Sequence, residues 1–377
     1  MKTLHPQFSL GDYFPPLDTR ISRSLIDETS LLKLRRYADS LPGQVSDFFG
    51  FECPLAANDH SVDLLFCSTQ LEGHAKILAG QHRSISIPEE LLQMPAWQKV
   101  REFCIDWENP SSGLYKQILN IWLEFDIGKS AAPYIPSIFF GVQPPDQSSN
   151  INSGPLLIIE ALEKLAPEAL EGKRALALNR VFESLPESAY IFQVGVMLAR
   201  DLPAIRLCLR DMPSEAIVPS LVQMGWQGST QRLSVLLDEL GQRSDSIDID
   251  IDVGEVIGDK IGLECSFGKN KLTLERMFAL TQWLAEQGVS SKEKAEALMA
   301  FNGLVHQDAE PGKWAPFLMK VASIAGPDVA NHISCWLHHV KVVLESNKPL
   351  SAKGYLGVVP DRLARQVLRE RMAELPR

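Results

Sequence analysis

Alternating apolar and polar residues recur in pairs along this chain, and each pair is separated from the next by segments with helical spacing. The clearest alternation covers residues 246–253, where Ile247, Ile249 and Ile251 share one face and aspartates occupy the other. A period of two predicts a half-buried strand. A second alternating run over 261–267 follows after a glycine-containing break, so the two runs are predicted to form a β-hairpin.

The same paired pattern occurs at four other places. The expected strand pairs are 62–67 with 74–78, 121–127 with 137–142, 190–198 with 205–210, and 339–344 with 352–358. Helical spacing predicts helices over 24–40, 88–107, 156–165, 175–185, 214–223, 229–240, 272–287, 290–301, 314–324 and 361–374. The chain therefore alternates hairpins with helices, and the hairpins recur every roughly 60–90 residues.

The two faces of the expected strands differ in polarity, and this difference leaves two α+β architectures open. In an open sandwich the charged face would meet bulk water, whereas in a closed antiparallel barrel of ten strands it would line a lumen, with the helices outside. Acids gather on the second and fourth hairpins and bases on the third and fifth, which favours the barrel. We expect a single barrel domain over 1–377, with a helical lead-in over 1–60.

Composition narrows the class of protein further. The net charge is −10, from 37 Lys and Arg against 47 Asp and Glu, and no basic cluster occurs, which argues against a nucleic-acid partner. No apolar run approaches the roughly 20 residues of a membrane-spanning helix, and the first residues do not resemble a secretory signal. Six scattered cysteines are typical of reduced cytoplasmic thiols. We therefore expect a cytoplasmic enzyme or binding protein without a membrane partner.

Five antiparallel hairpins interleaved with outer helices resemble the ABBA fold, or PT barrel, of the aromatic prenyltransferases. The resemblance covers most of the chain and rests on the order of its elements. One short residue match supports it, because Lys353-Gly354-Tyr355 is similar to the Lys-x-Tyr pairs of that family. In the family, a prenyl diphosphate and an aromatic acceptor meet inside the barrel.

The resemblance implies a diphosphate subsite made of inward basic and phenolic side chains. The residues at matching alternate positions are Arg206, Arg210, Lys341, Lys353 and Tyr355. Guanidinium and ammonium groups bind phosphate oxygens through charge-assisted hydrogen bonds. The family also shields the allyl cation with aromatic rings. Here Trp122 and Tyr190, with Tyr355, are the candidates, which is a thin shield in a chain of six tyrosines.

Acidic residues on the expected polar faces are candidates for two further roles. Glu124, or Asp126 one strand step away, could take the proton of the acceptor, although an ion-paired structural carboxylate is an alternative. A ladder of acids could meet the diphosphate through Mg²⁺, recognise a cationic acceptor, or form a solvated face. That ladder consists of Asp248, Asp250, Asp252 and Glu264. The expected cofactor is accordingly none, or Mg²⁺, and no metal ligand set is assigned.

Two functions remain open at this point. One is a transferase that moves a prenyl group from a prenyl diphosphate to an aromatic small molecule or a peptide side chain inside the lumen. The other is a non-catalytic protein of the same barrel shape that binds a peptide or a small ligand in a biosynthetic pathway.

Overall fold

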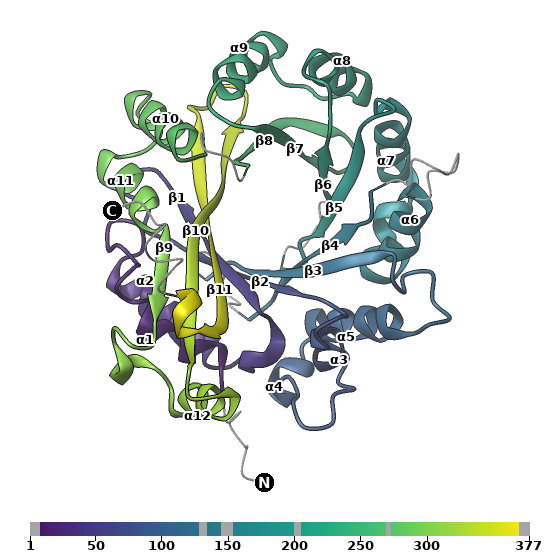
Figure 1. Cartoon of the computed structure of the whole chain (residues 1–377). Helices are drawn as coiled ribbons and strands as arrows, with labels where there is room; N and C mark the ends of the chain where they lie inside the picture. Colours follow the sequence, from purple (N-terminus) through teal and green to yellow (C-terminus); the bar gives the residue numbers. More distant parts are fainter. Residues whose placement is uncertain (1–7, 128–133, 145–153, 200–204, 269–272, 369–377) are drawn as a thin grey trace.

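The strands of this computed structural model, which describes residues 8–127, 134–144, 154–199, 205–268 and 273–368, close into a ten-stranded antiparallel barrel (Figure 1). Neighbours around the barrel follow the chain from β1 to β8 and continue through β10 to β11, which pairs back with β1. A short extra strand, β9, pairs with the first part of β10. The strands are β1 Phe48–Pro54, β2 Asp63–Ser68, β3 Ile118–Phe125, β4 Ser137–Val142, β5 Tyr190–Val196, β6 Ile205–Arg210, β7 Ser246–Val253, β8 Ile257–Ser266, β9 Gly303–His306, β10 Val329–Leu344 and β11 Ser351–Ala364.

The barrel confirms the closed alternative of the two expected architectures. Five hairpins contribute its ten strands, and the long pair β10–β11 supplies the closing contacts. Because β11 pairs with both β10 and β1, the wall of ten strands has no open edge.

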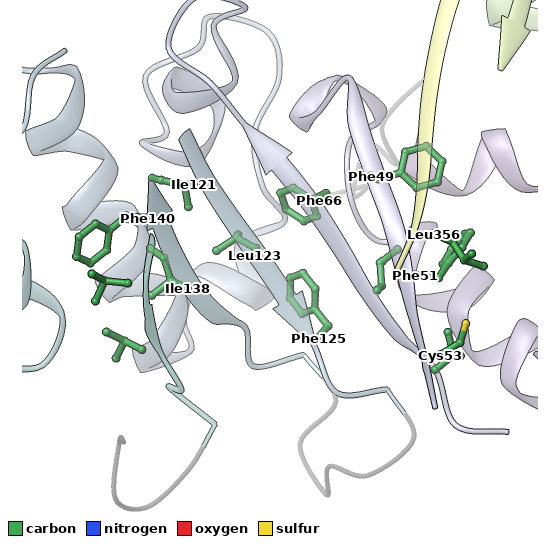
Figure 2. Packing of buried hydrophobic residues seen from close by; sticks show 14 of the residues in the cluster. Phe49, Phe51, Cys53, Phe66, Ile121, Leu123, Phe125, Ile138, Phe140 and Leu356 are labelled. Atoms are coloured by element: carbon green, nitrogen blue, oxygen red, sulfur yellow. The ribbon is translucent and has the colours of Figure 1, made fainter. Parts of the chain in front are cut away.

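Helices lie around the outside of the barrel, as Figure 1 shows for the view along its axis. Their bounds are α1 Phe14–Leu17, α2 Glu28–Ala38, α3 His74–Leu78, α4 Glu89–Leu92, α5 Pro95–Glu108, α6 Gly154–Leu165, α7 Gly172–Ser184, α8 Ser214–Met224, α9 Thr230–Gly241, α10 Thr273–Glu286, α11 Lys292–Ala300 and α12 Pro316–Ala325. The outer face of the strands is apolar and packs beneath these helices, with Phe49, Phe66, Phe125 and Phe140 fully buried (Figure 2). Burial of this face leaves the alternate residues of each strand to point into the lumen.

The first hairpin differs from the sequence prediction. Residues 62–67 correspond to strand β2, but 74–78 form helix α3, so the strand predicted there was wrong. The partner of β2 is β1, which lies within the expected helical lead-in. Helix α3 follows Gly73 (φ 77°), and its first side chain, His74, accepts a hydrogen bond from the Thr69 N–H at 3.3 Å. This left-handed turn reverses the chain before a second strand can form.

The C-terminal end also differs. A helix was predicted over 361–374, but β11 continues through Ala364 and pairs residues 361–364 with the beginning of β10. Helix is present at residues 365–368, and the rest of the predicted helix lies outside the described residues. Pro360 is accommodated because β11 has only β10 beside it at this point.

In the described part of the chain, no helix has both the length and the apolar character needed to span a membrane.

Candidate active site in the barrel lumen

The polar faces of the strands meet inside the barrel, where they surround a cavity of about 150 Å³. Its lining combines charged groups with aromatic rings. The charged and histidine side chains are Glu124, Arg210, Asp248, Glu264, His338, His339 and Lys341, and the aromatic ones are Phe48, Trp122, Phe139, Phe192 and Tyr355. A cavity of this size can hold a benzene-sized group.

Each basic side chain expected in the diphosphate subsite faces the lumen and contacts a carboxylate from a neighbouring strand. Arg206 Nε lies 2.8 Å from Asp252 Oδ1, and these two residues are directly paired between β6 and β7. Arg210 Nη2 lies 2.6 Å from Asp248 Oδ2, and these two residues are next to the last β6–β7 pair, Leu209 with Ile249. The bases were expected on the lumen side, and pairing of Arg210 with Asp248 was one of the alternatives that the sequence left open. The partner of Lys353, Glu52, was not expected.

Lys341 is the most buried of these cations. Its ammonium lies 2.9 Å from Glu264 Oε1 and also contacts Asp250. Burial lowers the pKa of Lys341, but the charges of Asp250 and Glu264 outweigh burial and hold it well above its ordinary value. The same pairing lowers the pKa of Glu264, against the effect of burial, whereas burial and the Glu264 charge raise that of Asp250.

Glu52 on β1 joins the remaining two members of the expected subsite. It is 1% exposed, and its carboxylate accepts hydrogen bonds from the Lys353 ammonium and the Tyr355 hydroxyl. Burial alone would raise the pKa of Glu52, but the cations Lys353 and Lys341 lower it to about 2. Sequence analysis missed this residue because β1 was assigned to the lead-in. The sequence feature that could have revealed Glu52 is the segment Phe48-Phe49-Gly50-Phe51-Glu52, in which one acidic residue follows three aromatic residues.

Glu124 lies on β3 beside a second acid that the sequence analysis missed, Asp63 on β2. Glu52, Asp63 and Glu124 each bring a carboxylate oxygen within 4.8 Å of the others. Burial raises the pKa of Glu124 to about 7, with a further contribution from the Glu52 charge. Burial, with the charges of Glu52 and Glu124, raises that of Asp63 to about 9. Asp126 follows the last residue of β3, and its charge also acts on Asp63.

The aromatic lining is richer than the sequence suggested. Trp122 lines the cavity as expected, and its ring meets that of Phe48 edge-on at 4.9 Å between centroids. The Tyr355 ring stacks on His339 at 4.0 Å, and Arg210 lies over the Phe192 ring at 3.7 Å. Tyr190 is the exception, because it stands at the start of β5 opposite Arg210 and is not among the residues that line the cavity.

The acidic ladder and the carboxylate cluster offer different surroundings to a metal ion. The three aspartates of the ladder each contact a basic side chain, so their charge is already balanced. Glu52 is bound to an ammonium and a hydroxyl, which would place a cation beside Mg²⁺ at the Glu52–Asp63–Glu124 cluster. Mg²⁺ prefers octahedral oxygen ligands with several waters, so these residues do not form a fitting Mg²⁺ site as arranged.

The sequence matches no protein-family model, and no curated protein matches it. Among solved structures, the chain is similar to the apo form of the prenyltransferase PriB, with a TM-score of 0.52, 15% identity, and coverage of 95% of this chain and 96% of that chain. A binary complex of PriB with product diphosphate gives the same values. The 5-dimethylallyltryptophan synthase from Streptomyces coelicolor has a TM-score of 0.49 at 13% identity, with coverage of 93% and 97%.

The similarity to PriB extends over nearly the whole of both chains, and it agrees with a closed barrel of five antiparallel hairpins inside a layer of helices. The chain therefore has the ABBA fold, or PT barrel.

Proposed function

We propose that this protein transfers a prenyl group from a prenyl diphosphate to an electron-rich acceptor inside the barrel lumen. One observation carries the proposal: Arg210, Lys341, Tyr355 and Glu124 line one aromatic cavity within the closed barrel. The cations suit a diphosphate, the rings suit an allyl cation, and the carboxylate suits the departing proton of the acceptor. The structural similarity to PriB, a prenyltransferase whose structure was solved with diphosphate, supports the same function.

The proposed reaction assigns a role to each group. The allylic carbon–oxygen bond breaks, and the diphosphate leaves with the bonding electron pair. Arg206, Arg210, Lys341, Lys353 and Tyr355 stabilise that developing negative charge, which is largest in the transition state. The acceptor forms a bond to the allylic carbon and loses a proton to Glu124, with Asp126 as the other candidate base. A base with a pKa near 7 is suited to this task at neutral pH.

Diphosphate binding must rearrange the ion pairs of the lumen. The cavity of about 150 Å³ is smaller than the roughly 300–1,000 Å³ of sites for drug-sized ligands. Arg210 and Lys353 are partly exposed and can turn away from their carboxylates. Their ammonium and guanidinium groups would then exchange a carboxylate for a diphosphate, which carries more negative charge.

The acceptor is proposed to be an aromatic small molecule or a peptide side chain. The benzene-sized cavity and its aromatic lining support a flat ring at this position. We propose a cytoplasmic location, supported by six cysteines that are all free and buried. The roles proposed for these residues do not use a metal. Dependence of the reaction on Mg²⁺ is tested by adding EDTA to the transfer assay.

Calorimetric titration with dimethylallyl and geranyl diphosphates tests the function. We expect saturable binding that weakens about tenfold or more in Lys353→Ala and in Arg210→Gln, because each loses a charged contact. Lys292→Ala, an exposed lysine on α11, should bind as the unaltered protein does. Circular dichroism of each variant checks that it is folded. If the folded protein takes up neither diphosphate, the transferase proposal is wrong.

The second candidate is a non-catalytic binding protein. It is favoured by the pairing of Arg206, Arg210, Lys341 and Lys353 with carboxylates in the described structure, which leaves these four cations neutralised. Mass spectrometry separates the two functions. A prenylated product, formed from a panel of tryptophan, tyrosine, histidine and arginine peptides with dimethylallyl diphosphate, favours the transferase. Ligand binding without any product favours the binding protein.

A further inference from the structure

The lumen holds more acids than bases, and the excess is localised. Its basic groups Arg206, Arg210, Lys341 and Lys353 all have carboxylate partners. Throughout the described residues, by contrast, no ion pair reaches Asp63 or Glu124. The lumen therefore has two carboxyl groups that its own cations leave unmatched.

Asp63 is held in a position that is costly for an unmatched acid. It is 3% exposed, and its Oδ1 has no hydrogen-bond partner in the described structure. The backbone fixes it there, because Asp63 is paired directly with Glu52 between β1 and β2, and the next lumen residue of β2, Leu65, is paired with Glu124 of β3. A buried carboxyl oxygen without a partner requires an explanation, and an absent ligand or water accounts for it.

The surroundings favour an organic cation as that ligand. Lys353 already binds Glu52 at the same cluster, and its ammonium would repel a divalent metal more strongly than a singly charged organic cation. Glu124 lines the cavity together with Trp122, Phe48 and Phe139, whose rings attract cations. The aromatic rings beside Glu124 supply no further oxygen ligands for a divalent metal.

A second cavity, of about 890 Å³, lies outside the lumen and is also acidic. It lies between β6, β7, α8 and α9, and it shares Arg210 and Asp248 with the lumen cavity. Its lining contains five acids and one base. The acids are Asp211, Glu215, Asp238, Asp245 and Asp248, and the base is Arg210. This cavity therefore carries an excess of negative charge beside the Arg210–Asp248 ion pair.

We propose that Asp63 and Glu124 bind a guanidinium or ammonium group of the acceptor, so that the acceptor is a cationic molecule or the side chain of a basic peptide. Only the identification of this ligand as the acceptor rests on the proposed function. The cation-binding site itself does not depend on prenyl transfer. Asp63 contributes one oxygen that lacks a partner, and Glu124 contributes the carboxylate that reaches the aromatic cavity.

Cation binding is expected to depend on pH. Both carboxyl groups have a raised pKa, about 7 for Glu124 and about 9 for Asp63, so in the free protein they hold protons around neutral pH. The groups that act on them are Glu52 from β1, Asp126 after β3, Lys353 from β11, Lys341 from β10 and Arg206 from β6. A cation displaces those protons, so its affinity rises between pH 6 and pH 8 in step with the loss of protons from Glu124.

Calorimetric titration without any prenyl diphosphate tests the proposal. The probes are Nα-acetyl-arginine methylamide and its uncharged counterpart, Nα-acetyl-citrulline methylamide. We expect the arginine probe to bind about tenfold or more tightly than the citrulline probe, since a charged hydrogen bond is lost in the latter. Asp63→Asn and Glu124→Gln should each weaken the arginine probe by a similar factor. Glu296→Gln, which removes one exposed acid from α11, should leave binding unchanged.

Other outcomes overturn the proposal. Equal affinity for the two probes would show that the protein does not recognise the positive charge. If neither probe binds, the proposed site does not exist. Heat on titration with MgCl₂ alone that disappears in Asp63→Asn would assign the cluster to a metal. These results are distinguishable from a failure of the proposed function, because that failure is measured with prenyl diphosphates and these titrations contain none.

Discussion

At the scale of single residues, three neighbouring carboxyl groups differ widely in acidity. Glu52, Glu124 and Asp63 lie on adjacent strands, yet their pKa values are about 2, 7 and 9. The cations Lys353 and Lys341 stabilise the charge of Glu52, and that charge then opposes ionisation of the other two. Separated pKa values of this kind allow one carboxyl to stay ionised while its neighbour exchanges a proton.

Asp63→Asn is predicted to stabilise the protein at neutral pH. The pKa of Asp63 is raised by folding, so its contribution to stability is fully present below its unfolded value near 4 and is lost as the pH rises towards 9. An amide does not ionise and has no such penalty. We therefore expect the variant's free energy of unfolding to exceed that of the unaltered protein by roughly 1–3 kcal/mol at pH 7, and this difference to vanish near pH 4. Thermal unfolding from pH 4 to pH 8 measures it. Asp238→Asn on α9 is the control, and an equal or lower stability of Asp63→Asn at pH 8 would contradict the prediction.

At the scale of elements, a buried lysine fastens helix α11 to the end of β1. Lys294 is 1% exposed, and its ammonium donates hydrogen bonds to the carbonyl oxygens of Pro54, at 2.8 Å, and of Asp59. Ser291 caps the same helix by accepting a bond from the Lys294 N–H. These contacts set where β1 ends and where the chain turns towards β2, and thus where Asp63 begins its strand.

Lys294→Met is therefore predicted to lower the free energy of unfolding by about 2 kcal/mol. The methionine keeps the apolar stem but leaves two carbonyl groups without their donor. Lys292→Met is the matched control on the same helix, where the side chain is 82% exposed, and it should change stability by less than about 0.5 kcal/mol. Urea unfolding compares the two variants. Similar midpoints for both would show that the buried contacts contribute little.

At the scale of the whole molecule, closure of the barrel is what turns surface charges into a site. The last strand, β11, pairs with the first, β1, and this contact alone brings Glu52 to Lys353 and Tyr355. Residues about 300 positions apart meet in this way. Contacts of such long range are associated with slow folding, because loop closure precedes the stabilising contact.

The acid-rich lumen predicts that diphosphate binding is coupled to proton uptake. An incoming anion favours the protonated forms of Asp250 and Glu124, whose pKa values burial already raises. Affinity for a prenyl diphosphate should therefore fall between pH 7 and pH 8.5, the opposite trend to that expected for a cation. Calorimetry in PIPES and in Tris, which differ in ionisation heat, counts the protons. Proton release, or no difference between the buffers, would contradict this account.

Much of the site could be predicted because strand periodicity fixes which face each residue occupies. Arg206, Lys341, Tyr355 and Glu124 were all expected on the polar face, and each is found in the lumen. The two histidines 338 and 339 show the limit of this rule. Strict alternation would separate them, but a bulge between Leu337 and His339 lets both line the cavity, with their Nδ1 atoms 2.8 Å apart.

The amino-acid sequence by itself determined four of the five hairpins, most of the helices between them and the division of those strands into an apolar and a charged face, because these follow from local periodicity. It could not reveal β1, since Phe48, Phe49 and Phe51 are apolar on both faces and hide the alternation. Only the tertiary structure decided which charges meet. Ion pairs such as Lys353–Glu52 depend on the register between strands far apart in the chain, and so does the lack of a partner for Asp63.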